Sequence, residues 1–324
     1  MTPFLGLRYP ILQAPIGNIA TVALAAAVSN AGGMGSLALT WTEPHVAQKL
    51  VGELKAITSN PFFVNFVLSF PPHALDTALE MGAPAVTFSW GRPSDRIARV
   101  HAAGAIAGVQ IASLDDARMA LDDGADFLIC QGQEAGGHVQ STQPLFDLLS
   151  NTVGIANPVP VVAAGGISDG EDMAQAVLAG AQAIMMGTRF VAVQESAAHD
   201  LYRTAILESQ SDDSVYTYCF DGGWPNAAHR VLRNDTLTAW EAAGCPKSGD
   251  RPGEGDTLAQ NDSGASIRRY DITPPTIGMN GAIHDCCLYA GAGCGKINDI
   301  PSASDVLKRI WSEYERAAKR GVHE

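Results

Sequence analysis

Short apolar runs alternate with helical patterns through the first two-thirds of this chain, with one run about every 20 to 30 residues. Eight runs are predicted as strands, at 11–14, 34–38, 62–68, 85–89, 105–110, 126–130, 159–163 and 183–186. Helices are predicted near 20–31, 43–57, 73–81, 93–103, 113–123, 143–152 and 169–179. All eight strands precede about residue 190 and none looks antiparallel. We therefore predict an α/β fold, a (β/α)8 barrel with parallel, covered strands. A doubly wound open sheet with fewer strands is the main alternative.

The pattern changes after Phe190. Residues 196–243 look largely helical, and 244–276 are rich in Gly, Pro, Ser, Asp and charge without periodicity. We predict a barrel over 1–195 and an inserted, mostly helical lid over the barrel mouth at 196–275, with a long loop in its second half. A glycine-rich return segment and an amphipathic helix at 302–319, packed on the barrel, make up 276–324. Loops as long as 244–276 are usually functional or mobile.

Charge and cysteine usage narrow the classes of function. The formal net charge is −13 and no run is rich in Lys or Arg, which argues against binding to a nucleic-acid backbone. No segment reaches the roughly 18 uninterrupted apolar residues of a membrane span, and the N-terminus is too short and polar for a signal peptide. Six cysteines without a C-x-x-C pair, two of them adjacent at Cys286 and Cys287, argue against a disulfide framework and a zinc site. Free thiols in the cytoplasm are the simplest account.

The stretch from Gln131 to His138 is the strongest candidate for a site. It directly follows the predicted buried strand at 126–130 and reads Gln-Gly-Gln-Glu-Ala-Gly-Gly-His. Gly136 and Gly137 lack Cβ atoms, so the backbone there can approach a ligand closely. His138 is the side chain of this loop that can exchange a proton near neutral pH. The alternative is a surface turn in which His138 only caps a neighbouring group.

A second candidate site lies where the last two barrel strands end. Gly165, Gly166 and Gly187 would expose backbone N–H groups, and Thr188 offers a hydroxyl. Loops at these positions of a barrel often hold phosphate, and a following helix start would add a favourable dipole. We therefore predict a phosphorylated cofactor, against the alternative that these glycines serve only tight turns. Arg189 is expected to pair with an acid such as Glu195 rather than to bind phosphate.

Several other residues are candidates for the site because of where they lie in the sequence. Asn65 is polar within an apolar strand and needs a partner, either a ligand at the mouth or an internal bond. Met185 and Met186 precede Gly187 and are more typical of a core. His199, His229 and His284 fall in the lid and could approach the mouth, although no spacing supports this, and no metal-ligand cluster is visible.

Taken together, these motifs resemble the nitronate monooxygenases, formerly called 2-nitropropane dioxygenases, which are FMN-dependent TIM barrels. The likeness rests on Gln13-Ala14-Pro15, residues 25–36, Asn65, residues 131–138 and 163–167, and 186–190, and it resumes at 288–293 and 299–301. It implies that FMN is held by residues at the strand ends: Ala14, Pro15, Asn65, Gln131, Gly136, Gly137, Gly165, Gly166, Met185, Met186, Gly187 and Thr188. It also implies His138 as the catalytic residue beside the flavin.

In that family a nitronate is oxidised with O₂ to a carbonyl compound and nitrite, so the resemblance implies a nitronate or nitroalkane, such as propionate 3-nitronate, as substrate. The similar FMN-dependent enoyl-acyl carrier protein reductases and NADH:quinone reductases are the alternatives. Ala14-Pro15 after Gln13, and Ser89-Trp90-Gly91, look more like the monooxygenases. A barrel that binds a phosphorylated metabolite without redox chemistry would need neither Gln131 nor His138. The unfamiliar stretch at 244–285 leaves the choice of substrate open, and a homodimer is one option for the assembly.

Overall fold

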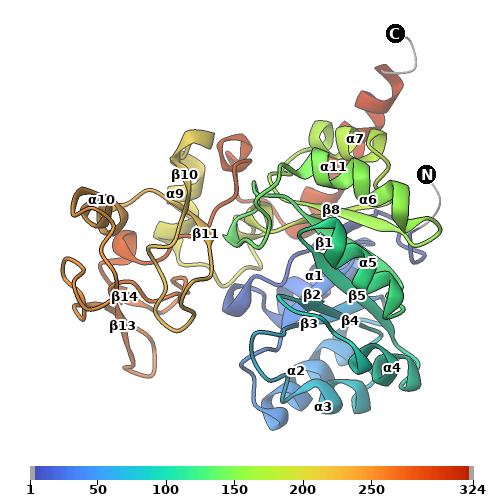
Figure 1. Ribbon diagram of the computed structural model, residues 1–324, viewed down its shortest axis with the longest axis horizontal. Coiled ribbons are helices and arrows are strands. Elements are labelled where there is room, and N and C mark those ends of the chain that lie inside the picture. The colour runs from blue at the N-terminus through green and yellow to red at the C-terminus, as the bar shows by residue number, and fades with distance from the viewer. Residues whose placement is uncertain (1–3, 321–324) are drawn as a thin grey trace.

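The computed structural model describes residues 4–320 and contains an eight-stranded parallel barrel (Figure 1). The strands are β1 (Ile11–Gln13), β2 (Gly35–Ala38), β3 (Phe62–Val67), β4 (Ala85–Ser89), β5 (Ile106–Ile111), β6 (Phe127–Gln131), β8 (Val161–Ala164) and β9 (Ala183–Met186). Their order is β1-β9-β8-β6-β5-β4-β3-β2, and a parallel bridge between Leu12 and Met34 brings the two ends of the sheet together. The predicted barrel is confirmed, and each predicted strand overlaps an observed one.

Helices cover the outside of the barrel, as predicted. They are α1 (Val22–Ala31), α2 (Pro44–Ile57), α3 (Leu75–Glu80), α4 (Asp95–Ala102), α5 (Leu114–Asp122), α6 (Leu145–Ala156) and α7 (Gly170–Leu178). Side chains of Thr21, Ser113 and Asp169 cap three of them by accepting a backbone N–H three residues on. Only the four-residue α8 (Thr188–Val191) follows β9 directly. The C-terminal α11 (Ala303–Arg320) packs against both α7 and α1 and so takes the place of the eighth barrel helix.

Apolar side chains fill the barrel interior and leave its carboxyl end as the place for a site. Leu12, Phe63, Phe127 and Met185 pack together inside. The ring of Phe4 meets that of Phe127 edge to face, with centroids 5.7 Å apart, at the amino end of β6. The amino end of the barrel is therefore plugged by the N-terminal segment.

Residues 196–287 form a separate lobe, and here the structure corrects the expectation of a mostly helical lid. Two helices, α9 (Asp200–Glu208) and α10 (Asp235–Ala242), accompany two small antiparallel sheets. The sheet strands of the lobe are β10 (Ser214–Thr217), β11 (His229–Leu232), β12 (Thr257–Gln260), β13 (Ser266–Arg268) and β14 (Asn280–Gly281). The stretch 244–276 is thus not a plain loop. Its strands have too few residues for a periodic pattern, and their burial comes from tertiary packing of Leu258 and Ile267. The limits of the three-part division stay a prediction.

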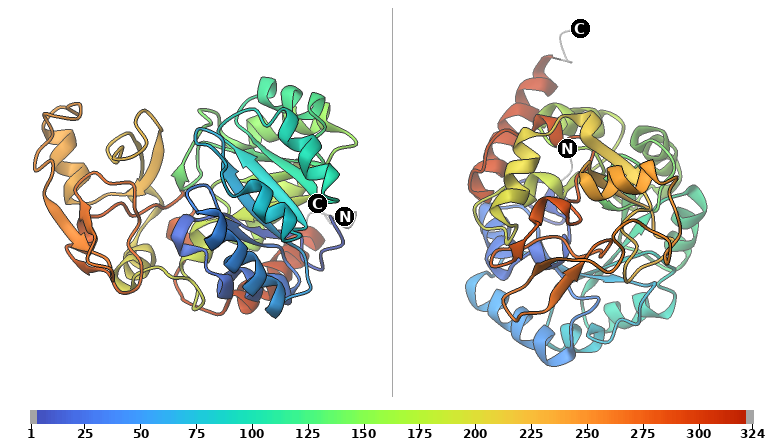
Figure 2. Two further views of the ribbon diagram at one scale, coloured as in Figure 1. Left: turned by 90° about the horizontal axis from the view of Figure 1, so that it is seen from below. Right: turned by 90° about the vertical axis from the view of Figure 1, so that its left-hand side faces the viewer.

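Strand pairing joins the lobe to the barrel mouth. The two-residue β7 (Gly137–His138) follows β6 and pairs antiparallel with β11, which also pairs with β10. In both views of Figure 2 the lobe lies at one end of the barrel. Four 3-10 turns complete the fold: η1 (Gly17–Ile19), η2 (Ser211–Asp213), η3 (Ile283–Asp285) and η4 (Cys294–Lys296). None of the helices within residues 4–320 has the length and apolar character needed to cross a membrane.

Candidate active site

Most of the predicted site residues come together at the carboxyl end of four adjacent strands. β1 pairs with β9, β9 with β8, and β8 with β6, so their ends are neighbours. Backbone bonds continue this contact past the strands, from Ala14 N–H to the Met186 oxygen and from Gly132 N–H to the Ala164 oxygen, both at 2.9 Å. The residues that follow these ends are half-buried: Ala14, Pro15, Gly136, Gly137, His138, Gly165, Gly166, Gly187 and Thr188.

Backbone amides at this rim are free to bind a ligand. Within residues 4–320, the N–H groups of Gly165, Gly166, Gly187 and Thr188 donate to no protein acceptor. Gly165 and Gly166 have φ angles of +116° and +71°, a conformation that favours glycine. The expected helix dipole contributes little, because α8 has only four residues and the start of α7 is capped by Asp169. Half-buried N–H groups need an acceptor, and the oxygens of a phosphate provide several.

His138 is positioned by Gln131 and by the return segment. The Gln131 side chain donates Nε2–H to the His138 carbonyl oxygen (3.1 Å) and accepts from Gln140 N–H (3.0 Å), so its amide supports the loop. A Cβ at Gly136 would lie 2.4 Å from the nitrogen of Gly291, which explains glycine there without a ligand. Gly291 N–H in turn donates to the Thr188 hydroxyl oxygen (3.0 Å). The return segment at 288–295 therefore connects the two candidate sites.

Aromatic rings enclose the His138 imidazole. The Trp224 ring stacks on it with centroids 4.2 Å apart and planes 26° apart, while Tyr289, His229 and Trp90 lie at 5.5, 5.6 and 6.2 Å. Nε2 of His138 is buried and has no hydrogen-bond partner within the described chain. Burial, and secondly the charge repulsion of His229, lower the pKa of His138 to about 3. The imidazole is therefore neutral at physiological pH, and its Nε2 is left able to accept a hydrogen bond or a proton from a ligand.

Trp224 was not predicted, and His229 was noted only as a lid histidine that could approach the mouth. His229 Nε2 accepts from Phe220 N–H (3.1 Å), so Nδ1 carries the proton and donates to the Ala227 oxygen (3.0 Å). The β7–β11 register places His229 opposite His138. No local pattern shows this, because the two strands are separated by the α6 to α9 part of the chain. Trp224 follows Gly222 and Gly223 in a loop that reads as an ordinary turn.

Two groups of predicted residues have internal roles. Asn65 donates Nδ2–H to the Thr87 hydroxyl (3.0 Å) and carbonyl (3.3 Å) oxygens, which is the internal alternative to a ligand bond. Met185 packs inside the barrel, and Met186 packs against the helices. Only their backbone atoms remain for contact with a ligand. Their assignment to the cofactor site stays a prediction.

Arg189 and His199 also have structural partners. Arg189 is buried and pairs with Asp299 (3.0 Å), not with Glu195, because Glu195 accepts from Ala303 N–H at the start of α11. His199 Nδ1 accepts from Leu201 N–H at the start of α9. No cluster of His, Cys, Asp or Glu suited to a metal ion occurs in the part of the chain that the structure describes.

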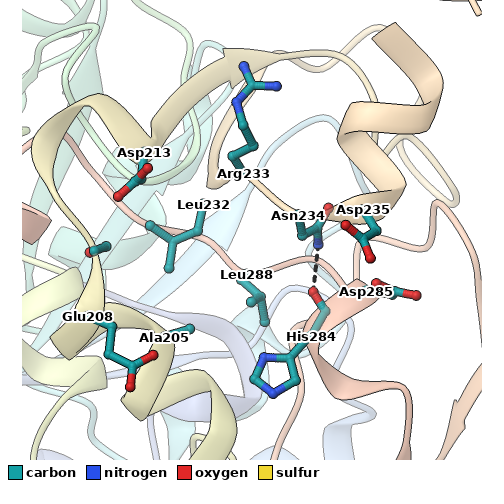
Figure 3. A pocket seen from close by; sticks show the side chains of 11 residues that line it. Ala205, Glu208, Asp213, Leu232, Arg233, Asn234, Asp235, His284, Asp285 and Leu288 are labelled. Carbon is teal, nitrogen blue, oxygen red and sulfur yellow. Dashed lines mark hydrogen bonds between the residues drawn. The ribbon is translucent and has the colours of Figure 1, made fainter. Parts of the chain in front are cut away.

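A cavity of about 290 Å³ lies in the lobe (Figure 3), and His138 is not among the residues that line it. Leu232 and Leu288 form apolar parts of its wall, and its charged lining consists of four carboxylates and the guanidinium of Arg233. The acidic residues are Glu208, Asp213, Asp235 and Asp285. No residue predicted for the FMN or catalytic site lines this cavity.

The comparisons with known proteins agree with the barrel fold. The sequence model of a family described as nitronate monooxygenase matches residues 1–78 and 72–313. The chain belongs to the nitronate monooxygenase family. It is therefore a flavin-dependent oxidoreductase of that family, whose members act on small molecules with O₂.

The names of individual relatives describe different activities. A nitronate monooxygenase of Pseudomonas aeruginosa is 30% identical over 96% of this chain and 98% of its own length. A (3aS,4S,5R,7aS)-5-hydroxy-7a-methyl-1-oxo-octahydro-1H-indene-4-carboxyl-CoA dehydrogenase of Rhodococcus jostii is 34% identical over 75% of this chain and 68% of its own.

Similar solved structures also have names that differ. FabK from Thermotoga maritima is similar with a TM-score of 0.78 and 29% identity, covering 98% of this chain and 96% of that chain. A nitroalkane oxidase of Streptomyces ansochromogenes has a TM-score of 0.78 and 26% identity, covering 97% of this chain and 98% of its own.

Proposed function

We propose that this protein is an FMN-dependent nitronate monooxygenase that converts an alkyl nitronate and O₂ to a carbonyl compound and nitrite. The observation that carries the proposal is the neutral, unpartnered Nε2 of His138 at the same barrel rim as the free amides of the β8 and β9 ends. A phosphorylated redox cofactor and a proton-transfer group would thereby share one mouth.

The donor set of the rim fits FMN. The amides of Gly165, Gly166, Gly187 and Thr188 would hold the terminal phosphate, which needs several N–H donors and no charged side chain. FMN when bound supplies an acceptor for the substrate's electrons, which then pass to O₂. A Cβ at Gly187 would lie 3.5 Å from Ile16 and 3.6 Å from Ala14, so nothing crowds this position within the protein.

His138 would handle the proton at the substrate carbon. A neutral imidazole can accept a proton from a nitroalkane at Nε2, and the resulting anion would stabilise the imidazolium beside it. A substrate already present as nitronate needs no such step and would use His138 only for orientation. Trp90 and Tyr289 would exclude water around the imidazole, which would strengthen these electrostatic contacts.

The CoA ester named in the Rhodococcus jostii relative suggests a second substrate class, an acyl thioester. The phosphates of the CoA moiety would need cationic side chains near the barrel mouth. The guanidinium of Arg230, in the strand opposite β7, is already bonded to the carbonyl oxygens of Gln133 and Ser214. The lobe cavity is lined by four carboxylates against one guanidinium, and the net charge of the chain is −13, which disfavours a polyanion. These features favour the nitronate.

Anaerobic reduction of the purified protein tests the proposal. The protein should be yellow, with flavin absorbance near about 450 nm. Ethylnitronate added without oxygen should bleach it within the mixing time, and NADH should not. Admission of air to the nitronate sample should restore the colour and release nitrite. Bleaching by NADH but not by nitronate would point instead to a reductase, and a colourless protein that takes up no FMN would exclude both.

A further inference from the structure

The loop at 220–228 of the lobe is held at both ends by one buried imidazole. His229 accepts from Phe220 N–H and donates to the Ala227 oxygen, at 3.1 and 3.0 Å. Between these anchors, Gly223 and Asn226 have φ angles of +101° and +62°. Gly222 is also fixed, because its N–H donates to the Tyr270 oxygen (2.9 Å) and its oxygen accepts from Ile272 N–H (3.3 Å). Trp224 therefore lies in the short stretch 223–226 between fixed points, and a change of backbone shape there would leave both ends in place.

Trp224 at the middle of this loop covers His138. Its side chain is 7% exposed. Its indole N–H donates to no acceptor among residues 4–320, so ring contacts alone hold it. Phe70 and Trp90 meet it edge-on, at centroid distances of 5.2 and 4.7 Å. Trp41, which is 59% exposed, lies 6.2 Å away on the solvent side.

A row of rings thus leads from solvent at Trp41 to the imidazole of His138. These rings come from the loops after β2, β3 and β4, whereas Trp224 comes from the lobe. Nε2 of His138 is buried, so a substrate can reach it only if one of the surrounding rings moves, and Trp224 is the ring with the shortest centroid distance to the imidazole. The space left behind has flat aromatic walls, which favour another flat group through stacked and edge-on contacts.

We propose that Trp224 is the gate and the specificity determinant of this site. The loop at 220–228 moves Trp224 off His138 when a ligand binds, and the vacated slot beside Trp90 and Phe70 accepts a flat, unsaturated or aromatic group. The substrate class would then be nitronates that carry such a group close to the reacting carbon. This inference rests on the proposed function for the reacting group, but the gate itself is testable without turnover.

Benzoate and acetate serve as the probes, because both are planar anions and only benzoate carries a ring. In calorimetric titrations of the flavin-loaded protein, Trp224→Ala should bind benzoate about tenfold more tightly than wild type, because binding no longer displaces the indole. Trp224→Phe should lie between them, and the ratio of benzoate to acetate affinity should stay high in all three. Trp240→Phe is the matched control, because Trp240 lies on α10 of the lobe and bonds only to the Pro246 oxygen.

Fluorescence supplies a second readout. Saturating benzoate should increase quenching by acrylamide in wild type and in Trp240→Phe, and should leave it unchanged in Trp224→Ala. Weaker benzoate binding in Trp224→Ala would show that Trp224 is a fixed wall and would overturn the gate. Equal affinities for benzoate and acetate would overturn the aromatic slot. If the benzoate and acetate affinities are as expected but nitronates do not bleach the flavin, the proposed reaction is wrong while the role of Trp224 as a gate is supported.

Discussion

Arg230 should be the main attachment between the lobe and the loop that carries His138. Its guanidinium donates Nε–H and Nη2–H to the Gln133 carbonyl oxygen, at 3.1 and 3.0 Å, and Nη1–H to the Ser214 oxygen at 2.8 Å. Gln133 lies between Gln131 and His138. The substitution Arg230→Met keeps much of the apolar stem and removes all three bonds.

The expected loss of stability is about 2 to 3 kcal/mol. Hydrogen bonds from a charged donor contribute about 1.5 to 3 kcal/mol each, and two carbonyl oxygens lose such a donor. The loss is partly offset because burial lowers the pKa of Arg230, which means that its charge is costly where it stands. For a chain of 324 residues this corresponds to a melting temperature lower by about 3 to 5 °C. Displacement of the loop by about 1 Å should also slow flavin reduction by ten- to a hundredfold.

Thermal unfolding followed by circular dichroism measures the first effect, and anaerobic stopped-flow reduction by ethylnitronate measures the second. Arg268→Met is the matched control. Arg268 is exposed on β13, and its side chain makes no hydrogen bond or ion pair within residues 4–320. The control should stay within about 0.5 kcal/mol of wild type. A melting temperature for Arg230→Met equal to that of the control would refute the anchoring role.

Three further predictions concern the site itself. His138→Ala should stay yellow and lose about 10² to 10⁴ in rate on neutral nitroalkanes but less on preformed nitronates, which steady-state assays with both forms would show; equal losses would contradict a role in proton transfer. Because the pKa of His138 falls from 6.5 to about 3 on folding, the unfolded state binds more protons between these values. The free energy of unfolding should therefore decrease as pH falls below about 6.5, by up to about 1.4 kcal/mol per pH unit from this group. Denaturant titrations at pH 7 and 5 should show a smaller difference in His138→Gln than in wild type. An equal difference in both proteins would show that other groups cause the pH dependence. Gly166→Val should lose FMN in an absorbance assay, whereas Gly104→Val, with a similar φ of +75° and open space around it, should retain it; equal flavin content would remove Gly166 from the phosphate site.

The barrel could be predicted from sequence because each of its units is local. An apolar run ends in a polar or glycine-rich turn and a helical pattern follows, as at 159–179, where β8 and α7 lie within the predicted limits to one or two residues. The rim followed from the same logic, because parallel strands in a barrel end on one face. Gly165 and Gly187 therefore had to be neighbours once their strands were recognised.

The lobe and the surroundings of His138 depend on contacts between distant segments. β11 pairs with β7 across about ninety residues of sequence. β7 has two residues and β11 has four, which is too short for a sequence pattern that would predict this pairing. The side-chain amide of Gln131 holds the His138 loop, a role that its neighbours in the sequence do not reveal, and its contact with FMN stays a prediction. Arg189 pairs with Asp299 rather than with Glu195, because the segment before α11 returns to the barrel beside α8. Tertiary partners decided each of these cases.

A crystal structure of the FMN-loaded protein is the most direct test of the shared mouth. The phosphate oxygens should accept from the N–H groups of Gly166 and Thr188, and the flavin ring should lie beside the His138 imidazole. A phosphate bound elsewhere, for example in the lobe cavity beside Arg233, or a flavin ring out of reach of His138, would contradict the account.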